Sequence, residues 1–257
     1  TEERRSPVPT TVVPVADRAE LTREAALRTW NLIIDAQGRG DGYARIVLTG
    51  GGAGIGTLRD ILALHQSALT QGDSFPTPVV DWNRVHVFFG DERNVAVNDP
   101  ESNEGQAREA LLDHVGIPED NIHGWRFGEL SLEDGVTAYE GVLAQYAPKG
   151  FDLHLLGMGH EGHMNSLFPH TDAVRETERL VLAVTDSPKP PAERGTLTLP
   201  AVAQADHVWL LIDGAAKAEA AAHVIAESPA EDWPAAGAHG RKETLVFLAD
   251  DAARAGA

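Results

Sequence analysis

The 257-residue sequence is 42% hydrophobic, which is enough for a sizeable core, and it contains no cysteine. The missing cysteine excludes disulfides, thiolate nucleophiles and cysteine-bound metal centres. With 39 acidic against 21 basic residues the formal net charge is -18, which argues against nucleic acid and anionic membrane surfaces as partners.

The N-terminal region is charged and interrupted by prolines. Residues 1–17 hold no apolar segment of the kind found in signal peptides, and no later apolar run approaches the length of a membrane-spanning helix. We therefore expect a soluble, cytoplasmic protein that folds as one domain over 1–257, with about the first 15 residues as a loose arm. A first helix is predicted from near Thr22, where apolar residues recur at helical spacing, to the glycines at 38–42.

Four apolar runs, each followed at once by a glycine-containing turn, dominate the rest of the sequence. Helices are predicted after three of them, starting near Thr57, near Ser102 and at about Ala215, and a last strand is predicted at 243–250. This alternation predicts an α/β fold: a single-domain, doubly wound, mainly parallel sheet with helices on both faces. Polar residues from distant turns are then expected to meet at the carboxyl ends of the strands. The four runs with their turns are RIVLTGGGAGIG (45–56), VHVFFGDER (85–93), LHLLGMGHEGH (153–163) and VWLLIDGAAK (208–217).

The glycine-rich stretch TGGGAGIGT at 49–57 lies between a predicted strand and a predicted helix. Its backbone N–H groups could face an anion at the helix N-terminus, as in phosphate-binding loops. It departs from the dinucleotide-binding pattern, which needs glycine or alanine where Ile55 stands, and no lysine follows as in a P-loop. A tight turn that uses glycine only for its backbone geometry is the alternative interpretation.

The segment GDERNV at 90–95 ends a predicted strand with two carboxylates and a cation. The grouping with Asp91 and Glu92 could orient a hydroxylated substrate, or it could stabilise a developing oxyanion through Arg93. A solvated charged loop is the alternative.

The segment GMGHEGHMNSLFPH at 157–170 concentrates histidine and glycine after an apolar run. His163 can act as a general base at neutral pH, and Glu161 could orient it. A zinc site of His160, His163 and His170 is disfavoured, because the first two are three residues apart with a glycine between them, whereas zinc-protease helices space them by four.

Cations gather in two later segments. SPKPPAERGTLTLP at 187–200 places Lys189 and Arg194 in a proline-rich loop before a β-prone run, and Lys217 opens a predicted helix. A lysine at a helix start is electrostatically disfavoured unless an anion is bound there, so these residues are candidate phosphate ligands. A solvated surface lysine is the alternative for Lys217.

Taken together and in this order, these segments resemble the 6-phosphogluconolactonases. VLTGGGAG, VHVFFGDERNV followed by SNEGQAREALL, GMGHEGHMNSLFP, PKPPAERGTLTLP and GAAKAEA carry the resemblance, which runs from about Arg45 to about Ala220. It implies the fold shared with glucosamine-6-phosphate deaminases and ribose-5-phosphate isomerases. It also implies hydrolysis of 6-phosphoglucono-δ-lactone to 6-phosphogluconate in the oxidative pentose phosphate pathway, without metal or cofactor. The expected assembly is a monomer or small homo-oligomer.

The resemblance assigns roles by position. His163 is the base that activates water, Arg93 stabilises the carbonyl oxygen or the substrate, and Glu161 helps to set His163. The residues implied to hold the substrate and its 6-phosphate are Gly50, Gly51, Gly52, Ala53, Gly54, Asp91, Arg194 and Lys217.

Two departures and two alternatives remain. The family has serine and threonine in its SGGST turn where this chain has Gly52 and Ala53, followed by Gly54, and it has aspartate where Glu161 stands. The related deaminases and isomerases carry tyrosine in place of Arg93 and glutamate in place of Phe168, so both positions favour the lactonase. A non-catalytic sugar-phosphate-binding module is the other alternative, which the acidic charge argues against.

Overall fold

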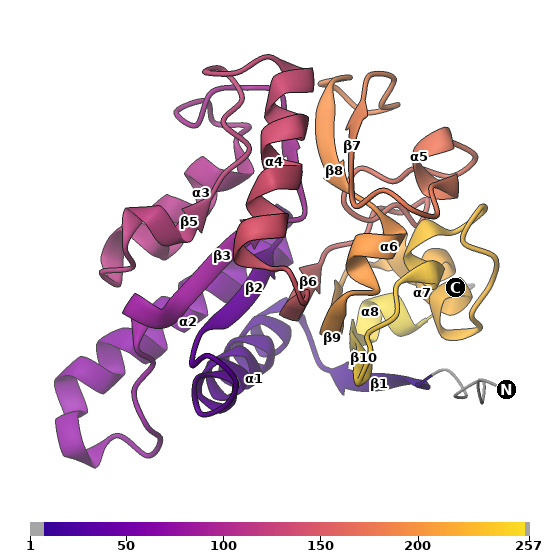
Figure 1. Cartoon of the computed structure of the whole chain (residues 1–257). Coiled ribbons are helices and arrows are strands. Elements are labelled where there is room, and N and C mark those ends of the chain that lie inside the picture. Colours follow the sequence, from indigo (N-terminus) through magenta and orange to yellow (C-terminus); the bar gives the residue numbers. More distant parts are fainter. Residues whose placement is uncertain (1–7, 255–257) are drawn as a thin grey trace, which may run out of the picture.

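The computed structural model describes residues 8–254 and is shown in Figure 1. Its strands are β1 (Thr10–Val15), β2 (Ala44–Leu48), β3 (Val85–Phe89), β4 (Asp91–Arg93), β5 (Ile122–His123), β6 (Phe151–Leu156), β7 (Val181–Val184), β8 (Arg194–Leu197), β9 (Ala205–Ile212) and β10 (Glu243–Ala249). Its α-helices are α1 (Arg18–Gln37), α2 (Gly51–Gln71), α3 (Asn103–Ala110), α4 (Leu132–Tyr146), α5 (Asp172–Arg175), α6 (Leu199–Val202), α7 (Ala218–Ile225) and α8 (Asp250–Ala253). Short 3-10 segments are η1 (Gly72–Ser74), η2 (Trp82–Arg84), η3 (Leu112–His114), η4 (Glu119–Asn121), η5 (Ala215–Lys217) and η6 (Pro234–Gly237).

Seven strands form one parallel sheet in the order β1-β10-β9-β6-β2-β3-β5. All five predicted strands lie in it, so the predicted mainly parallel α/β fold is confirmed. The inner strands are covered on both faces and therefore read as nearly continuous apolar runs, β3 being buried at every position. From β2 the chain crosses outward to β3, whereas from the neighbouring β6 it crosses to β9 on the other side. Sheets of this type bind ligands at such a switch point.

Helices cover both faces of this sheet. On one face α1 packs against α2 and α2 against α3, in crossovers that run toward β5. The crossovers through α4 and α7 run the opposite way, and right-handed connections then place these helices on the other face. Within the described part of the chain, no helix is both long and apolar enough to cross a membrane.

A second sheet of three antiparallel strands, β4-β8-β7, was not predicted. Its strands β7 and β8 stand beside α4 in Figure 1. In this sheet Arg93 of β4 is the direct cross-strand neighbour of Arg194 of β8. The GDER segment and the end of the proline-rich segment, distant in sequence, therefore share one surface.

The N-terminal region differs from the prediction. Residues 10–15 form β1 and pair with β10, so the predicted loose arm is wrong for them, and residues 1–7 lie outside the described residues. Helix α1 begins at Arg18 rather than near Thr22, because the side chain of Asp17 caps it by accepting the N–H of Glu20 at 2.9 Å.

Helix α2 begins at Gly51 rather than near Thr57. Gly51 has a φ of 80°, a conformation that glycine adopts without strain, and this turns the chain from strand into helix almost at once. The glycine-rich stretch is consequently the first turn of the helix and not a loop before it. The predicted start near Ser102 is confirmed, since Ser102 caps α3, whereas the segment after residue 214 opens with η5 before α7.

Candidate active site

A cavity of about 210 Å³ lies at the carboxyl ends of β2 and β6, at the switch point of the sheet. The turns after these two strands line it through residues 49–51 and 157–159. Strand β4 and the start of α3 contribute further lining, and so do the segment that contains His163 and the three cations Lys189, Arg194 and Lys217. The predicted gathering of distant turns is therefore confirmed for most of the predicted residues.

The N-terminus of α2 opens onto this cavity. Its capping position is Gly50, and among residues 8–254 no side chain accepts a hydrogen bond from the N–H groups of the first turn. These free N–H groups and the helix dipole favour an anion. Of the predicted turn, only Gly50 and Gly51 line the cavity; Gly52 is exposed in the helix, and Ala53 and Gly54 are buried in it.

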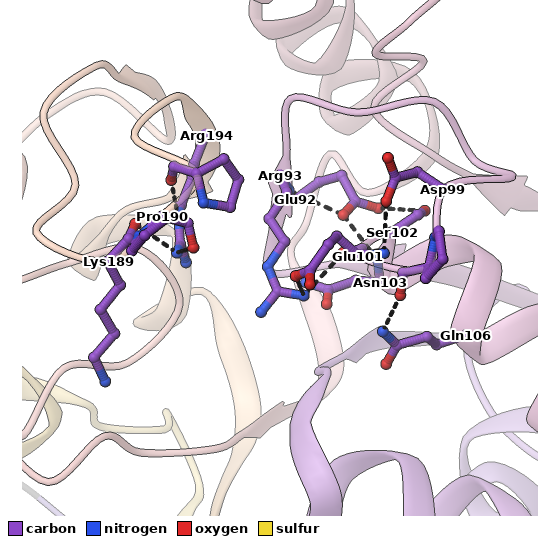
Figure 2. Close-up of polar contacts among 12 residues, drawn as sticks. Glu92, Arg93, Asp99, Glu101, Ser102, Asn103, Gln106, Lys189, Pro190 and Arg194 are labelled. Atoms are coloured by element: carbon purple, nitrogen blue, oxygen red, sulfur yellow. Dashed lines mark hydrogen bonds and ion pairs between the residues drawn. The ribbon is translucent and has the colours of Figure 1, made fainter.

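Glu92 holds one wall of the cavity in place through contacts that the sequence did not predict. Only 4% exposed, its carboxylate accepts the backbone N–H of Arg93 at 2.9 Å, of Asn103 at 2.8 Å and of Glu104 at 3.0 Å. It also accepts the Ser102 hydroxyl at 3.3 Å. These contacts tie β4 to the start of α3, as Figure 2 shows for the labelled residues.

The pKa of Glu92 reflects two opposing effects. Burial raises the pKa of this carboxyl to about 7, against the three backbone N–H donors, which lower it. The charge of Asp91 raises it further. Glu92 is therefore poised to change its protonation near neutral pH.

Side chains from β4 and α3 meet at this wall. Asp91 accepts the Ser166 hydroxyl at 2.7 Å and the Asn103 amide at 3.2 Å, so it is a fixed acceptor at the edge of the cavity. The guanidinium of Arg93 donates to the backbone carbonyl of Glu101 at 2.9 Å and lies 3.1 Å from its carboxylate. Arg93 thus reaches the cavity already paired with a carboxylate.

Arg194 approaches the same cavity with different partners. It is 5% exposed and donates to the carbonyls of Pro191 at 3.1 Å, Lys189 at 3.1 Å and Pro190 at 3.3 Å, an arrangement visible in Figure 2. Within residues 8–254 no carboxylate lies within 4 Å of its guanidinium nitrogens. Burial lowers its pKa, and the neighbouring charge of Arg93 lowers it further while Asp91 raises it. The charge of Arg194 is therefore held in place but left without a counter-ion.

Lys217 and Lys189 at the cavity also differ in whether a carboxylate is paired with the charge. Lys217 donates to the carbonyl of Met158, and within the described residues no carboxylate is in ion-pair contact with it. Burial lowers its pKa, and the charge of Lys189 adds to this effect. The side chain of Lys189 is 41% exposed, and its ammonium lies 3.4 Å from the carboxylate of Glu161.

His163 lines the cavity and Glu161 stands behind it. The carboxylate of Glu161 is hydrogen-bonded to Nδ1 of His163, whose ring stacks on Phe168 with 4.6 Å between centroids. Burial raises the pKa of Glu161, but the hydrogen bond and charge of His163 outweigh this and hold it at about 2. The carboxylate is thus ionised at neutral pH, fixes the tautomer with a proton on Nδ1 and leaves Nε2 as the basic nitrogen.

The three histidines considered for a metal site contact carboxylates instead, and His160 shares Glu161 with His163. His160 lies 3.1 Å from Glu161, whereas His170 contacts the carboxylates of Glu231 and Asp232 at 3.6 and 3.4 Å. Among residues 8–254 no three His, Cys, Asp or Glu side chains converge as metal ligands would.

Comparison with known proteins assigns the family. A family model described as glucosamine-6-phosphate isomerases/6-phosphogluconolactonase matches residues 16–247. The chain belongs to this family. A Mycobacterium leprae protein named 6-phosphogluconolactonase is 50% identical over 219 residues, 82% of this chain and 84% of that protein. The crystal structure of a Thermotoga maritima 6-phosphogluconolactonase is 26% identical, covers 94% of this chain and 100% of that one, and has a TM-score of 0.77.

The other branch of the family shares the fold. A monomeric glucosamine-6-phosphate deaminase structure matches with a TM-score of 0.79 at 22% identity, covering 95% of this chain and 98% of that one. At this identity the likeness concerns the fold alone. Arg93 and Phe168, the two positions at which the sequence favours the lactonase, both lie at the site, since Arg93 lines the cavity and Phe168 stacks on His163.

Some site residues were missed by the sequence predictions. Thr49, Asn103 and Asn165 line the cavity, and Lys189 was noted only as a candidate cation. The predicted helix start near Ser102 was a signal for Asn103, because it placed the N-terminus of that helix shortly after the GDER segment. Nothing in the sequence marked Asn165, which has a φ of 48° and contacts the buried His154 at 3.4 Å.

Proposed function

We propose that this chain hydrolyses 6-phosphoglucono-δ-lactone to 6-phosphogluconate by water that His163 activates. One observation carries the proposal: His163, hydrogen-bonded to Glu161, lines the same small cavity as Arg194 and Lys217, which among residues 8–254 have no carboxylate in ion-pair contact. The relatives named 6-phosphogluconolactonase, one of them 50% identical, support the same reaction.

The chemistry needs few groups, because a lactone is an activated ester. Nε2 of His163 takes a proton from water while the water oxygen bonds to the lactone carbonyl carbon. Arg93 stabilises the negative charge that develops on the carbonyl oxygen. The bond from this carbon to the ring oxygen then breaks, and the protonated His163 returns its proton to that oxygen. The carboxylic acid so formed ionises and releases a proton.

The phosphate group sets the position of the reacting carbon. The free N–H groups at the start of α2, together with Arg194 and Lys217, supply positive charge and donors at the cavity. A phosphate held there fixes the ring, so its carbonyl stays close to His163. Asp91, already a fixed acceptor, is placed to receive a sugar hydroxyl.

Proton release from freshly generated 6-phosphoglucono-δ-lactone tests the proposal. The wild-type protein should accelerate it well above the spontaneous rate, and a chelator should not change the rate. Turnover at the spontaneous rate would contradict the proposal. Ammonia release from glucosamine 6-phosphate, measured in parallel, tests the deaminase alternative, for which we expect no activity.

The predictions of a single domain over 1–257, of a monomer or small homo-oligomer and of a cytoplasmic location are proposals as well. Light scattering of the purified protein and fractionation of the source cells would test the last two.

A further inference from the structure

The guanidinium of Arg18 lies directly on the first turn of α2. Arg18 is the first residue of α1, and a Cβ atom at Gly52 would stand only 2.4 Å from its Nη1 and 2.8 Å from its Cζ. Gly52, unlike Gly51, does not have a positive φ. The backbone conformation therefore does not require glycine at position 52. The position of the Arg18 guanidinium does, because a Cβ atom there would overlap with it.

Arg18 brings a third positive element to this corner of the molecule. The N-terminus of α2 is uncapped, and Lys217 is close enough that the charge of Arg18 contributes to lowering its pKa, after burial and Lys189. In the part of the chain that the structure describes, Arg18 is paired with one carboxylate, that of Asp213, with 2.8 Å between Nε and Oδ2. A cation at a helix N-terminus is unfavourable unless an anion lies between them.

The side chain of Arg18 is also accessible, since 58% of its surface is exposed. Its Nε is used by Asp213, and within the described residues its Nη atoms have no hydrogen-bond partner. A guanidinium with free Nη donors beside free helix N–H groups matches the oxygens of a phosphate monoester.

We propose that Arg18 is a specificity-determining residue that binds the phosphate group of the substrate from the position that a side chain at residue 52 would occupy. This inference rests on the proposed function. In this chain, the serine and threonine that the resemblance leads one to expect at the turn are replaced by a glycine that admits Arg18 and by a buried alanine.

A double-mutant cycle on Arg18 and Gly52 tests the inference. Arg18→Ala should raise KM for the phosphorylated lactone about tenfold at low salt with kcat little changed, and less at high salt. Gly52→Ala should also raise KM, because its Cβ displaces the guanidinium, while thermal stability is unchanged or higher since alanine suits a helix. In the double variant the second substitution should add little. Arg23→Ala, an exposed arginine of the same helix, is the matched control.

Two results would overturn the inference. One is an Arg18→Ala variant with the KM of the Arg23→Ala control. The other is a Gly52→Ala effect that is equally large when Arg18 is absent. Titration with inorganic phosphate separates this inference from the proposed function: a wild-type protein without lactonase activity refutes the latter, whereas equal phosphate affinities of wild type and Arg18→Ala refute the former.

Discussion

Arg93 and Arg194 are cross-strand neighbours in the small sheet, yet their surroundings differ, as Figure 2 shows. Arg93 is paired with the carboxylate of Glu101, and its strand is anchored by the buried Glu92. Arg194 is fixed by backbone carbonyls and lies over the ring of Phe168, contacts that orient its guanidinium without neutralising its charge. We call the first region, Arg93 with Glu101 and Glu92, the frame, because its cation is paired with a carboxylate and its contacts orient the side chains. The second region, around Arg194, presents a positive charge that no carboxylate pairs with among the described residues.

This difference explains how a protein of net charge -18 can attract a phosphorylated substrate. The local potential depends on the few charges at the cavity and not on the sum over the chain. Like charges placed directly across two strands repel each other, which an anion bound between them would relieve. The two regions should therefore respond differently to substitution.

His163→Ala should have the largest effect, because it removes the proposed base from between the two regions. We expect kcat to fall by about 10²- to 10⁴-fold, with affinity for inorganic phosphate retained. Steady-state kinetics and phosphate titration measure the two. His207, which is paired with Glu243 near the opposite end of the sheet, offers a matched control. Unchanged turnover in His163→Ala would remove His163 from the mechanism.

Arg194→Met should have the next largest effect. It deletes a charge without a counter-ion, and we expect KM for the phosphorylated lactone to rise by about 10- to 100-fold, with a smaller change in kcat. Arg179→Met, which deletes an exposed arginine paired with Glu140, should leave KM unchanged. A KM for Arg194→Met equal to that of this control would show that Arg194 does not hold the phosphate.

Glu92→Gln should weaken the frame. The amide NH₂ of glutamine cannot accept the N–H groups that the carboxylate accepts, so we expect about 1–3 kcal/mol less free energy of unfolding and a lower kcat/KM. Urea unfolding and kinetics measure these quantities. A restored kcat/KM in Glu92→Asp, which keeps the carboxylate, would indicate that the acceptor matters more than the side-chain length.

The pH dependence of that variant tests the position of Glu92 further. Its pKa in the folded protein, about 7, lies above the ordinary 4.5, so folding favours the protonated form. The contribution is complete below pH about 4.5 and is lost as pH rises through about 7. The loss of stability in Glu92→Gln should therefore be larger at pH 5 than at pH 8. A loss that grows with pH would contradict the raised pKa.

Lys189→Ala should have the smallest effect. Its ammonium is partly exposed and already paired with Glu161, and exposed ion pairs of this kind contribute little. We expect KM to change by less than about threefold. A change as large as that of Arg194→Met would show that the contrast between paired and unpaired cations does not decide phosphate binding.

The sequence was sufficient to predict the sheet and the meeting of its turns, because buried parallel strands are short apolar runs and their glycine turns are recognisable. It did not predict β1, which contains Pro14 and is stabilised at the sheet edge by pairing with β10, far along the chain. It did not predict the small sheet either, whose strand β4 is only three residues long.

At the site, the residue types with obvious chemistry could be predicted and those that act through contacts could not. His163, Arg93 and Arg194 stand in recognisable segments. The contact of the Glu92 carboxylate with the first N–H groups of α3 depends on where α3 begins relative to β4. The contact of Arg18 with Gly52 depends on the packing of α1 against α2. Neither relation is local in the sequence.

The most direct test of this account is the ratio of kcat/KM for 6-phosphoglucono-δ-lactone to kcat/KM for the unphosphorylated glucono-δ-lactone, measured for wild type, Arg93→Met and Arg194→Met. Arg194→Met should lower this ratio by at least about tenfold, because only the phosphorylated substrate uses the unpaired charge. Arg93→Met should lower both values of kcat/KM and leave the ratio within about threefold. Equal falls of the ratio in both variants, or an unchanged ratio in Arg194→Met, would contradict the claim that Arg194 binds the phosphate whereas the frame around Arg93 does not.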